Sequence, residues 1–100
     1  MVIYEITAVV QTELVEDYEK YMRERHIPDL LATGYFSGAA FTRSGENHYR
    51  VRYEAFSRKS LDDYLEKNAE SLRADFLAHF PEGIELSRRI WDVLQVWTID

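Results

Sequence analysis

The sequence predicts an α+β fold, with four strands in one antiparallel sheet and two helices on one face of that sheet. Two observations carry this prediction. Stretches in which apolar residues alternate with a period of two, as in strands, are separated by stretches with the three- and four-residue spacing of helices. Their order along the 100 residues is strand, helix, strand, strand, helix, strand. Two such halves form a four-stranded sheet, and the length suits one domain, residues 1–100.

The first strand is predicted over Ile3–Val10, where β-branched and aromatic residues are frequent. Successive side chains of a strand point to opposite faces of the sheet. One face is uniformly apolar and is expected to meet the core; it carries Tyr4, Ile6, Ala8 and Val10. The other face is mixed and carries Ile3, Glu5, Thr7 and Val9.

The first helix is predicted to begin at Thr12, whose hydroxyl can cap a free backbone N–H group. Apolar residues at three- and four-residue spacing follow from Leu14 onward. Pro28 has no N–H group and disfavours helical geometry at the residue before it, so we expect the helix to break near His26–Ile27. A short helical turn over Pro28–Ala32 should then begin at the proline.

The next two strands are predicted to form a hairpin. They run over Tyr35–Arg43 and His48–Phe56, and the polar residues 44–47 between them contain a glycine. The second of these strands has the clearest alternation in the chain. Its apolar face carries Tyr49, Val51, Tyr53 and Ala55. Its opposite face carries His48, Arg50, Arg52, Glu54 and Phe56.

The second half of the chain closes the fold. A single long helix is predicted from Leu61 to Phe80, with Ser60 and Asp63 as a capping box. A long last strand is predicted from Ile84 or Leu86 to Thr98. Both faces of this strand are apolar, because one of them carries Trp91, Val93 and Trp97 and the other carries Ile90, Leu94 and Val96.

This arrangement is the ferredoxin-like fold, and it leaves one face of the sheet uncovered. The tryptophans of the last strand, together with Ile3, Val9 and Phe56, are expected on that open face. A monomer rarely leaves such an apolar patch bare. Two sheets packed face to face would bury it, so the sequence predicts a homodimer through the open sheet face.

Composition and charge exclude several classes of partner. The formal net charge of −6 repels phosphate groups, so neither nucleic acid nor an anionic membrane is an expected partner. The absence of cysteine removes disulfides and thiolate metal sites. No basic leader begins the chain and no apolar run approaches the roughly 20 residues of a membrane helix, so a cytoplasmic protein is expected.

His26 is the first candidate for chemistry. Its ordinary pKa lies near neutrality, which suits a general acid or base, and Asp29 is close enough in sequence to orient it. The alternative is structural: His26 near a helix end interacts with free carbonyl groups, and Asp29 stabilises the start of the short helix. The sequence leaves His26 and Asp29 as candidate catalytic residues.

The polar face of the hairpin strand is the second candidate. Arg50 and Arg52, with Glu5 on the neighbouring first strand, could bind a small-molecule acid through a bidentate contact. The alternative is that Glu5 and Glu54 form ion pairs with the two arginines and fix the register of the strands. The three histidines have no metal-ligand spacing, and the sequence predicts neither a metal nor a cofactor.

The chain also resembles a known family. The opening residues 2–10, the segment 26–34 and the stretches 49–56, 61–65 and 72–74 are similar to the small bacterial family catalogued as domain of unknown function 4286. That family resembles the dimeric α/β-barrel proteins in architecture, and it implies no catalytic residue. We expect a dimeric ligand-binding or interaction module. The alternative is a cofactor-independent enzyme, of monooxygenase or isomerase type, with His26 as acid or base.

Overall fold

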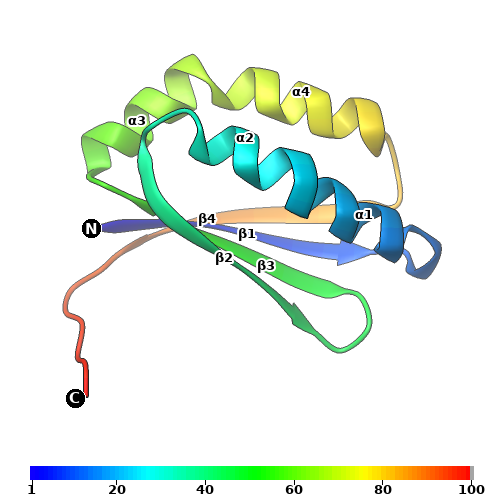
Figure 1. Cartoon of the computed structure of the whole chain (residues 1–100), viewed down its shortest axis with the longest axis horizontal. Helices are drawn as coiled ribbons and strands as arrows, with labels where there is room; N and C mark the ends of the chain where they lie inside the picture. The colour runs from blue at the N-terminus through cyan, green and yellow to red at the C-terminus, as the bar shows by residue number, and fades with distance from the viewer. Residues whose placement is uncertain (100) are drawn as a thin grey trace.

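The computed structural model describes residues 1–99 and has two layers, with the helices stacked on one face of a single sheet (Figure 1). The strands are β1 (Val2–Val10), β2 (Phe36–Ser44), β3 (His48–Ala55) and β4 (Ile84–Asp92). The helical segments are η1 (Thr12–Leu14), α1 (Val15–Tyr21), η2 (Met22–His26), α2 (Ile27–Leu31), α3 (Arg58–Lys67) and α4 (Ala69–His79). None of the helices within residues 1–99 is long and apolar enough to cross a bilayer.

The sheet has the strand order β2-β3-β1-β4, and each neighbouring pair is antiparallel. This order and the placement of the helices confirm the predicted ferredoxin-like fold. The register places Tyr4 of β1 between Tyr53 of β3 and Ile90 of β4. Residues that share this parity face the helices, and those of the opposite parity face away from them.

The core lies between the sheet and the helices, as the alternation of the strands predicts. On β3, Tyr49, Val51, Tyr53 and Ala55 are buried, and every residue between them is exposed. Phe76 and Phe80 cover Tyr18 from the side of α4, with ring centroids 6.3 and 6.2 Å from its ring. Aromatic packing therefore joins the first helix to the end of α4 on the helix-facing side of the sheet.

The expected helix break near His26–Ile27 is wrong, because the helix continues through Pro28. Residues Met22–His26 form a π turn, in which the N–H group of Ile27 bonds to the carbonyl oxygen of Met22, five residues back. A proline inside an α-helix clashes with the carbonyl group four residues before it. The wider π turn absorbs this conflict, and α2 then begins with Pro28 in its first turn.

The helix of the second half also differs from the prediction. Instead of one helix over 61–80 there are two, α3 and α4, which meet at Asn68 with φ −126° and ψ −28°. Asparagine is a poor residue for a helix interior because its side chain competes for backbone hydrogen bonds. The predicted caps are wrong as well. Ser57, not Ser60, caps α3 by accepting a hydrogen bond from the N–H group of Ser60, and Thr12 caps no helix.

The last strand ends earlier than predicted. Asp92 pairs with Val2, and the N–H group of Val93 makes one further bond to the carbonyl oxygen of Met1. Beyond that point β1 offers no backbone partner, so residues 93–99 leave the sheet as an extended tail that carries Trp97 with it (Figure 1).

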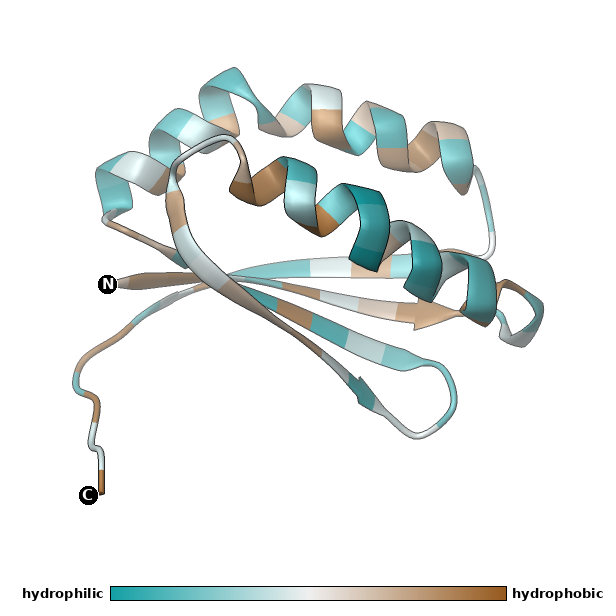
Figure 2. Cartoon of the chain, viewed as in Figure 1, coloured by the Kyte–Doolittle hydropathy of each residue, from teal (hydrophilic) through white to brown (hydrophobic). Residues whose placement is uncertain are grey.

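The tail carries mostly apolar residues, interrupted by Gln95 and Thr98 (Figure 2). Leu94, Val96 and Trp97 are exposed, while Val93 and Val96 line a hollow on the open sheet face together with Ile3. Ile3 is itself only 5% exposed, so the expectation that it stands bare on that face is wrong. Trp91 is on the open face as predicted, and it is 43% exposed.

Candidate functional site

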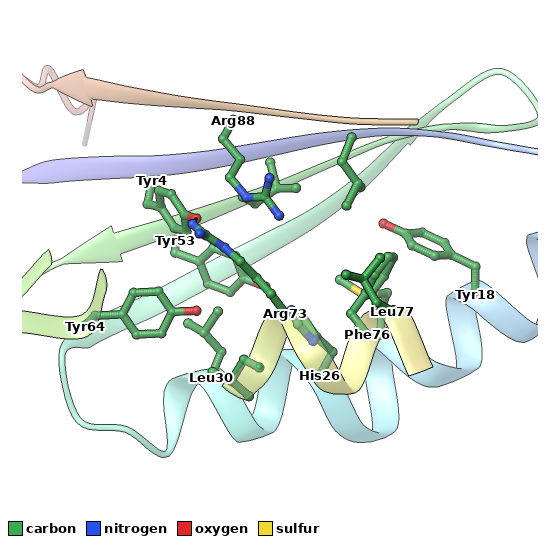
Figure 3. A pocket seen from close by; sticks show the side chains of 14 residues that line it. Tyr4, Tyr18, His26, Leu30, Tyr53, Tyr64, Arg73, Phe76, Leu77 and Arg88 are labelled. Atoms are coloured by element: carbon green, nitrogen blue, oxygen red, sulfur yellow. Dashed lines mark hydrogen bonds between the residues drawn. The ribbon is translucent and has the colours of Figure 1, made fainter. Parts of the chain in front are cut away.

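A cavity of about 340 Å³ lies between the sheet and the helices (Figure 3). Its walls are mostly apolar and aromatic, and every strand except β2 contributes to them. The helices close the opposite side. This volume falls within the range of pockets that hold small organic ligands. The cavity is the strongest candidate for a functional site in the described residues.

One stripe of the first helix forms a wall of this cavity. Tyr18, Met22, His26 and Leu30 follow each other at intervals of four residues and all line the cavity. In a straight α-helix, residues four apart drift around the axis by about 40° at each step. The π turn over Met22–His26 holds more residues per turn and reverses part of this drift. The local distortion around Pro28 therefore keeps His26 directed into the cavity.

His26 lines the cavity and has a buried, unpaired ring nitrogen. Its ring packs against Tyr21 and Phe76, with centroid distances of 5.8 and 5.7 Å. Its Nδ1 atom is buried and has no hydrogen-bond partner among the described residues. Burial lowers the pKa of His26, an effect that the negative charges of Asp75 and Asp29 partly oppose and that Arg88 reinforces. The imidazole is therefore neutral at neutral pH and can accept a proton or a hydrogen bond.

Asp29 does not join His26 at the cavity. It is an exposed residue in the first turn of α2 and contributes to His26 only through its charge. The carboxylate that fixes this region is Asp75 on α4. It accepts hydrogen bonds of 2.7 Å from both the Tyr21 hydroxyl and the Arg25 guanidinium. The hydrogen bond from Tyr21 is the main cause that lowers the pKa of Asp75, and Arg25 lowers it further.

Three tyrosine side chains also line the cavity. The hydroxyl of Tyr53 is buried without a hydrogen-bond partner in the described part of the chain, and burial raises its pKa. Burial likewise raises the pKa of Tyr64. The hydroxyl of Tyr4 accepts a hydrogen bond of 3.0 Å from Nη2 of Arg73. The raised pKa values keep the hydroxyls of Tyr53 and Tyr64 protonated at neutral pH, so both can donate to a bound molecule.

Two arginines complete the cavity, and sequence reasoning missed both. Arg73 extends from α4 and reaches the hydroxyl of Tyr4, and Arg88 extends from β4 on the opposite side of the cavity (Figure 3). Arg88 stands on the helix-facing side of β4 because it pairs with Ile6 of β1. The position of Arg88 in its strand could have indicated this, because Arg88 lies two residues before Ile90 and therefore shares the face on which the sequence had placed Ile90. A charge at this parity departs from the apolar pattern of the strand, and Arg88 is exposed at the edge of the cavity.

The polar group predicted on the open sheet face is also present, and Glu5 is at its centre. The Nε atoms of Arg50 and Arg52 lie 3.2 and 3.7 Å from Oε1 of Glu5. The indole Nε1 of Trp91 donates a hydrogen bond of 3.0 Å to Oε2. Glu54 accepts a hydrogen bond from the Ser37 hydroxyl instead. One carboxylate thus serves both arginines, which is the ion-pairing arrangement that the sequence left open.

Solved structures of the same fold come from several bacteria. A protein assigned as an antibiotic biosynthesis monooxygenase from Deinococcus radiodurans aligns over 100% of this chain and 99% of its own, with a TM-score of 0.73 and 13% identity. A variant of SnoaB, a cofactor-independent oxygenase from Streptomyces nogalater, aligns over 95% of both chains, with a TM-score of 0.73 and 10% identity. These identities show a shared fold alone.

The haem degrader MhuD from Mycobacterium tuberculosis, solved with two haems in its active site, has a TM-score of 0.72 at 16% identity and covers 98% of this chain and 100% of its own. Within residues 1–99, no three acidic, histidine or cysteine side chains cluster as metal ligands.

No curated relative matches the sequence. A family model, Domain of unknown function (DUF4286), matches residues 1–94. The chain therefore belongs to the family of domain of unknown function 4286.

Proposed function

We propose that the protein is a homodimeric binding protein for a small organic molecule, and that the cavity between α4 and the sheet is its binding site. One observation carries this proposal. Two buried polar atoms, Nδ1 of His26 and the hydroxyl oxygen of Tyr53, belong to residues that line the cavity and lack hydrogen-bond partners among the described residues. Buried polar groups are almost always paired, and a bound molecule would supply the missing partners.

A cavity-filling variant tests the binding site. Leu72→Phe enlarges a half-buried side chain that lines the cavity, and Leu65→Phe is a matched control because Leu65 packs against the core without lining the cavity. The probes are bicyclic aromatic compounds such as naphthol and naphthamide, and binding is followed by NMR line broadening. Binding to the wild type and to Leu65→Phe, with loss in Leu72→Phe, is the expected result. Equal binding by all three proteins would place the probes elsewhere.

The homodimer is part of the same proposal. Exposed apolar side chains at the open face and in the tail support it, among them Phe56, Trp91, Leu94 and Trp97. An apolar surface of this kind favours burial against a second copy of the sheet. Light scattering across a dilution series should give twice the mass of one chain. The mass of a single chain at micromolar concentration would contradict the dimer.

A cofactor-independent enzyme is the second candidate, and the state of His26 favours it. A neutral imidazole with a free Nδ1 inside an apolar cavity can take a proton from an activated C–H group of a bound molecule. The fold shared with SnoaB, which is named as a cofactor-independent oxygenase, supports the same class of activity.

Proton exchange tests this candidate without an oxidant. Tetralone has an acidic C–H group on a bicyclic body, and abstraction of that proton in deuterated water leads to deuterium incorporation. The wild type should accelerate the exchange, and His26→Gln should abolish the acceleration. Asp29→Asn should leave most of it, since Asp29 acts on His26 only through its charge. An exchange rate equal to that in buffer would remove the enzyme from consideration.

A further inference from the structure

The arginines of this chain divide into two groups by their partners. Those in the first part of the sequence each form a salt bridge with a carboxylate; they are Arg23, Arg25, Arg43, Arg50, Arg52 and Arg58. Arg73, Arg88 and Arg89 form none with the described residues, although the protein carries an excess of negative charge. Arg89 lies over the ring of Trp91, 5.3 Å from its centroid. Arg73 and Arg88 are therefore the arginines without a counter-charge or an aromatic partner.

These two arginines belong to the same cavity. Both line it, Arg73 from the helix side, where it donates a hydrogen bond to the hydroxyl of Tyr4, and Arg88 from the sheet side (Figure 3). They act together on Tyr64, since the positive charge of each opposes the rise of its pKa. Like charges in one site repel each other, more strongly beside an apolar wall than in open water. An anion between them would relieve this repulsion.

We propose that Arg73 and Arg88 bind the anionic group, a carboxylate or a phosphate monoester, of an organic acid whose apolar body fills the cavity. This proposal rests on the proposed function, because it names the ligand class of the same site. Guanidinium groups suit it, since their planar N–H pairs bind carboxylate and phosphate oxygens in bidentate fashion. The hydroxyl of Tyr4 accepts from Arg73, so its own proton is free to point at the same anion.

The rest of the cavity matches the apolar part of such a molecule. Leu30, Met22 and Phe76 are buried residues that line it. A volume of about 340 Å³ accommodates a body of one or two fused rings. The unpaired atoms of His26 and Tyr53 can bind one carbonyl or hydroxyl group on that body. Charge at the arginines and a neutral polar substituent inside would together set the specificity.

The experiment compares probes that share a body and differ in charge. Naphthoate, naphthyl phosphate and the uncharged naphthamide are titrated into the full chain by calorimetry. The variants are Arg73→Gln and Arg88→Gln. The matched control is Arg89→Gln, which removes the same charge from the residue next to Arg88 on the opposite face of β4. Circular dichroism confirms that each variant keeps its fold, as expected for exposed side chains.

At least one of the two anions should bind the wild type about tenfold or more tightly than naphthamide does. Arg73→Gln and Arg88→Gln should each bind that anion about tenfold more weakly than the wild type. Arg89→Gln should keep wild-type affinity. Whichever anion binds more tightly identifies the head group. Equal affinity for all three probes, or a loss in Arg89→Gln as large as in the other variants, would overturn the anion site while cavity binding stands. Failure of all three probes to bind would overturn the anion site and the proposed function together.

Discussion

The buried hydroxyl of Tyr53 makes a prediction about stability that depends on its lack of a partner. Tyr53 is 1% exposed, and its hydroxyl oxygen has no hydrogen-bond partner in the described residues. Tyr53→Phe removes that oxygen and leaves the ring packing against Tyr4 and Phe36 in place. Most core substitutions destabilise a protein. Here we expect the free energy of unfolding to stay unchanged or to rise.

The magnitude follows from the cost of an unpaired polar group. A buried hydroxyl without a partner costs about 1–3 kcal/mol, so its removal should raise stability by up to about 1 kcal/mol once the remaining void is counted. For a domain of this size, about 1 kcal/mol corresponds to roughly 4–8 °C in Tm. The matched control is Tyr49→Phe on the same face of β3. The Tyr49 hydroxyl donates a hydrogen bond of 2.6 Å to Glu19, and its loss should destabilise the protein by about 1–2 kcal/mol.

Urea unfolding of both variants and the wild type, at one protein concentration, measures the difference. The concentration must be held constant because assembly of copies changes the apparent stability. The expected order of stability is Tyr53→Phe at or above the wild type, with Tyr49→Phe below both. A loss in Tyr53→Phe as large as that in Tyr49→Phe would mean that the Tyr53 hydroxyl is satisfied in the free protein. The argument that a ligand completes the cavity would then fail.

Three further predictions concern separate parts of the fold. Burial lowers the pKa of His26 from its ordinary value of 6.5. As the pH falls below about 6.5, the unfolded chain therefore binds a proton that the folded protein does not, and the free energy of unfolding declines. Urea unfolding between about pH 8 and 5 measures this decline, and His26→Gln should lack the share that is due to His26. Glu5→Gln leaves Arg50 and Arg52 unpaired and should cost about 1 kcal/mol, an effect that shrinks at high salt; no cost at low salt would contradict the ion pairs. Gly83→Ala should lower the stability by about 1 kcal/mol or more, because Gly83 has φ +91° and a Cβ atom there would lie 2.5 Å from a side-chain carbon of Leu14. Thermal unfolding measures this loss, and an unchanged Tm would refute it.

Strand alternation explains why the architecture was predictable. Tyr49 and Tyr53 are buried and Arg50 and Arg52 are exposed, as period-two patterning requires. The same patterning placed Glu5 opposite the two arginines, and the register pairs Glu5 directly with Arg52. Such local rules determine which residues share a face. They also determine the order of strands and helices, from which the ferredoxin-like fold follows.

The features that sequence reasoning missed depend on contacts distant in the chain or on rare local geometry. The end of β4 at Asp92 is set by the place where β1 begins, which no property of residues 93–98 reveals. The continuity of the helix through Pro28 depends on a π turn, a rare form that single-residue propensities disfavour. Arg73 and Arg88 are far apart in sequence, and the parity of one strand alone could not show that α4 would bring a second arginine to the same cavity.

The two faces of the sheet differ in how their positive charges are balanced, and this difference supports the two roles proposed for them. On the open face, Arg50 and Arg52 share the carboxylate of Glu5, which lowers the cost of burying these two charges against a second copy. Burial of an uncompensated charge would cost several kcal/mol. On the helix-facing side, Arg73 and Arg88 have no carboxylate partner in the described residues and line a cavity. The proposed dimer contact therefore uses the face where Arg50 and Arg52 share a carboxylate, and the proposed anionic ligand uses the cavity where Arg73 and Arg88 have none.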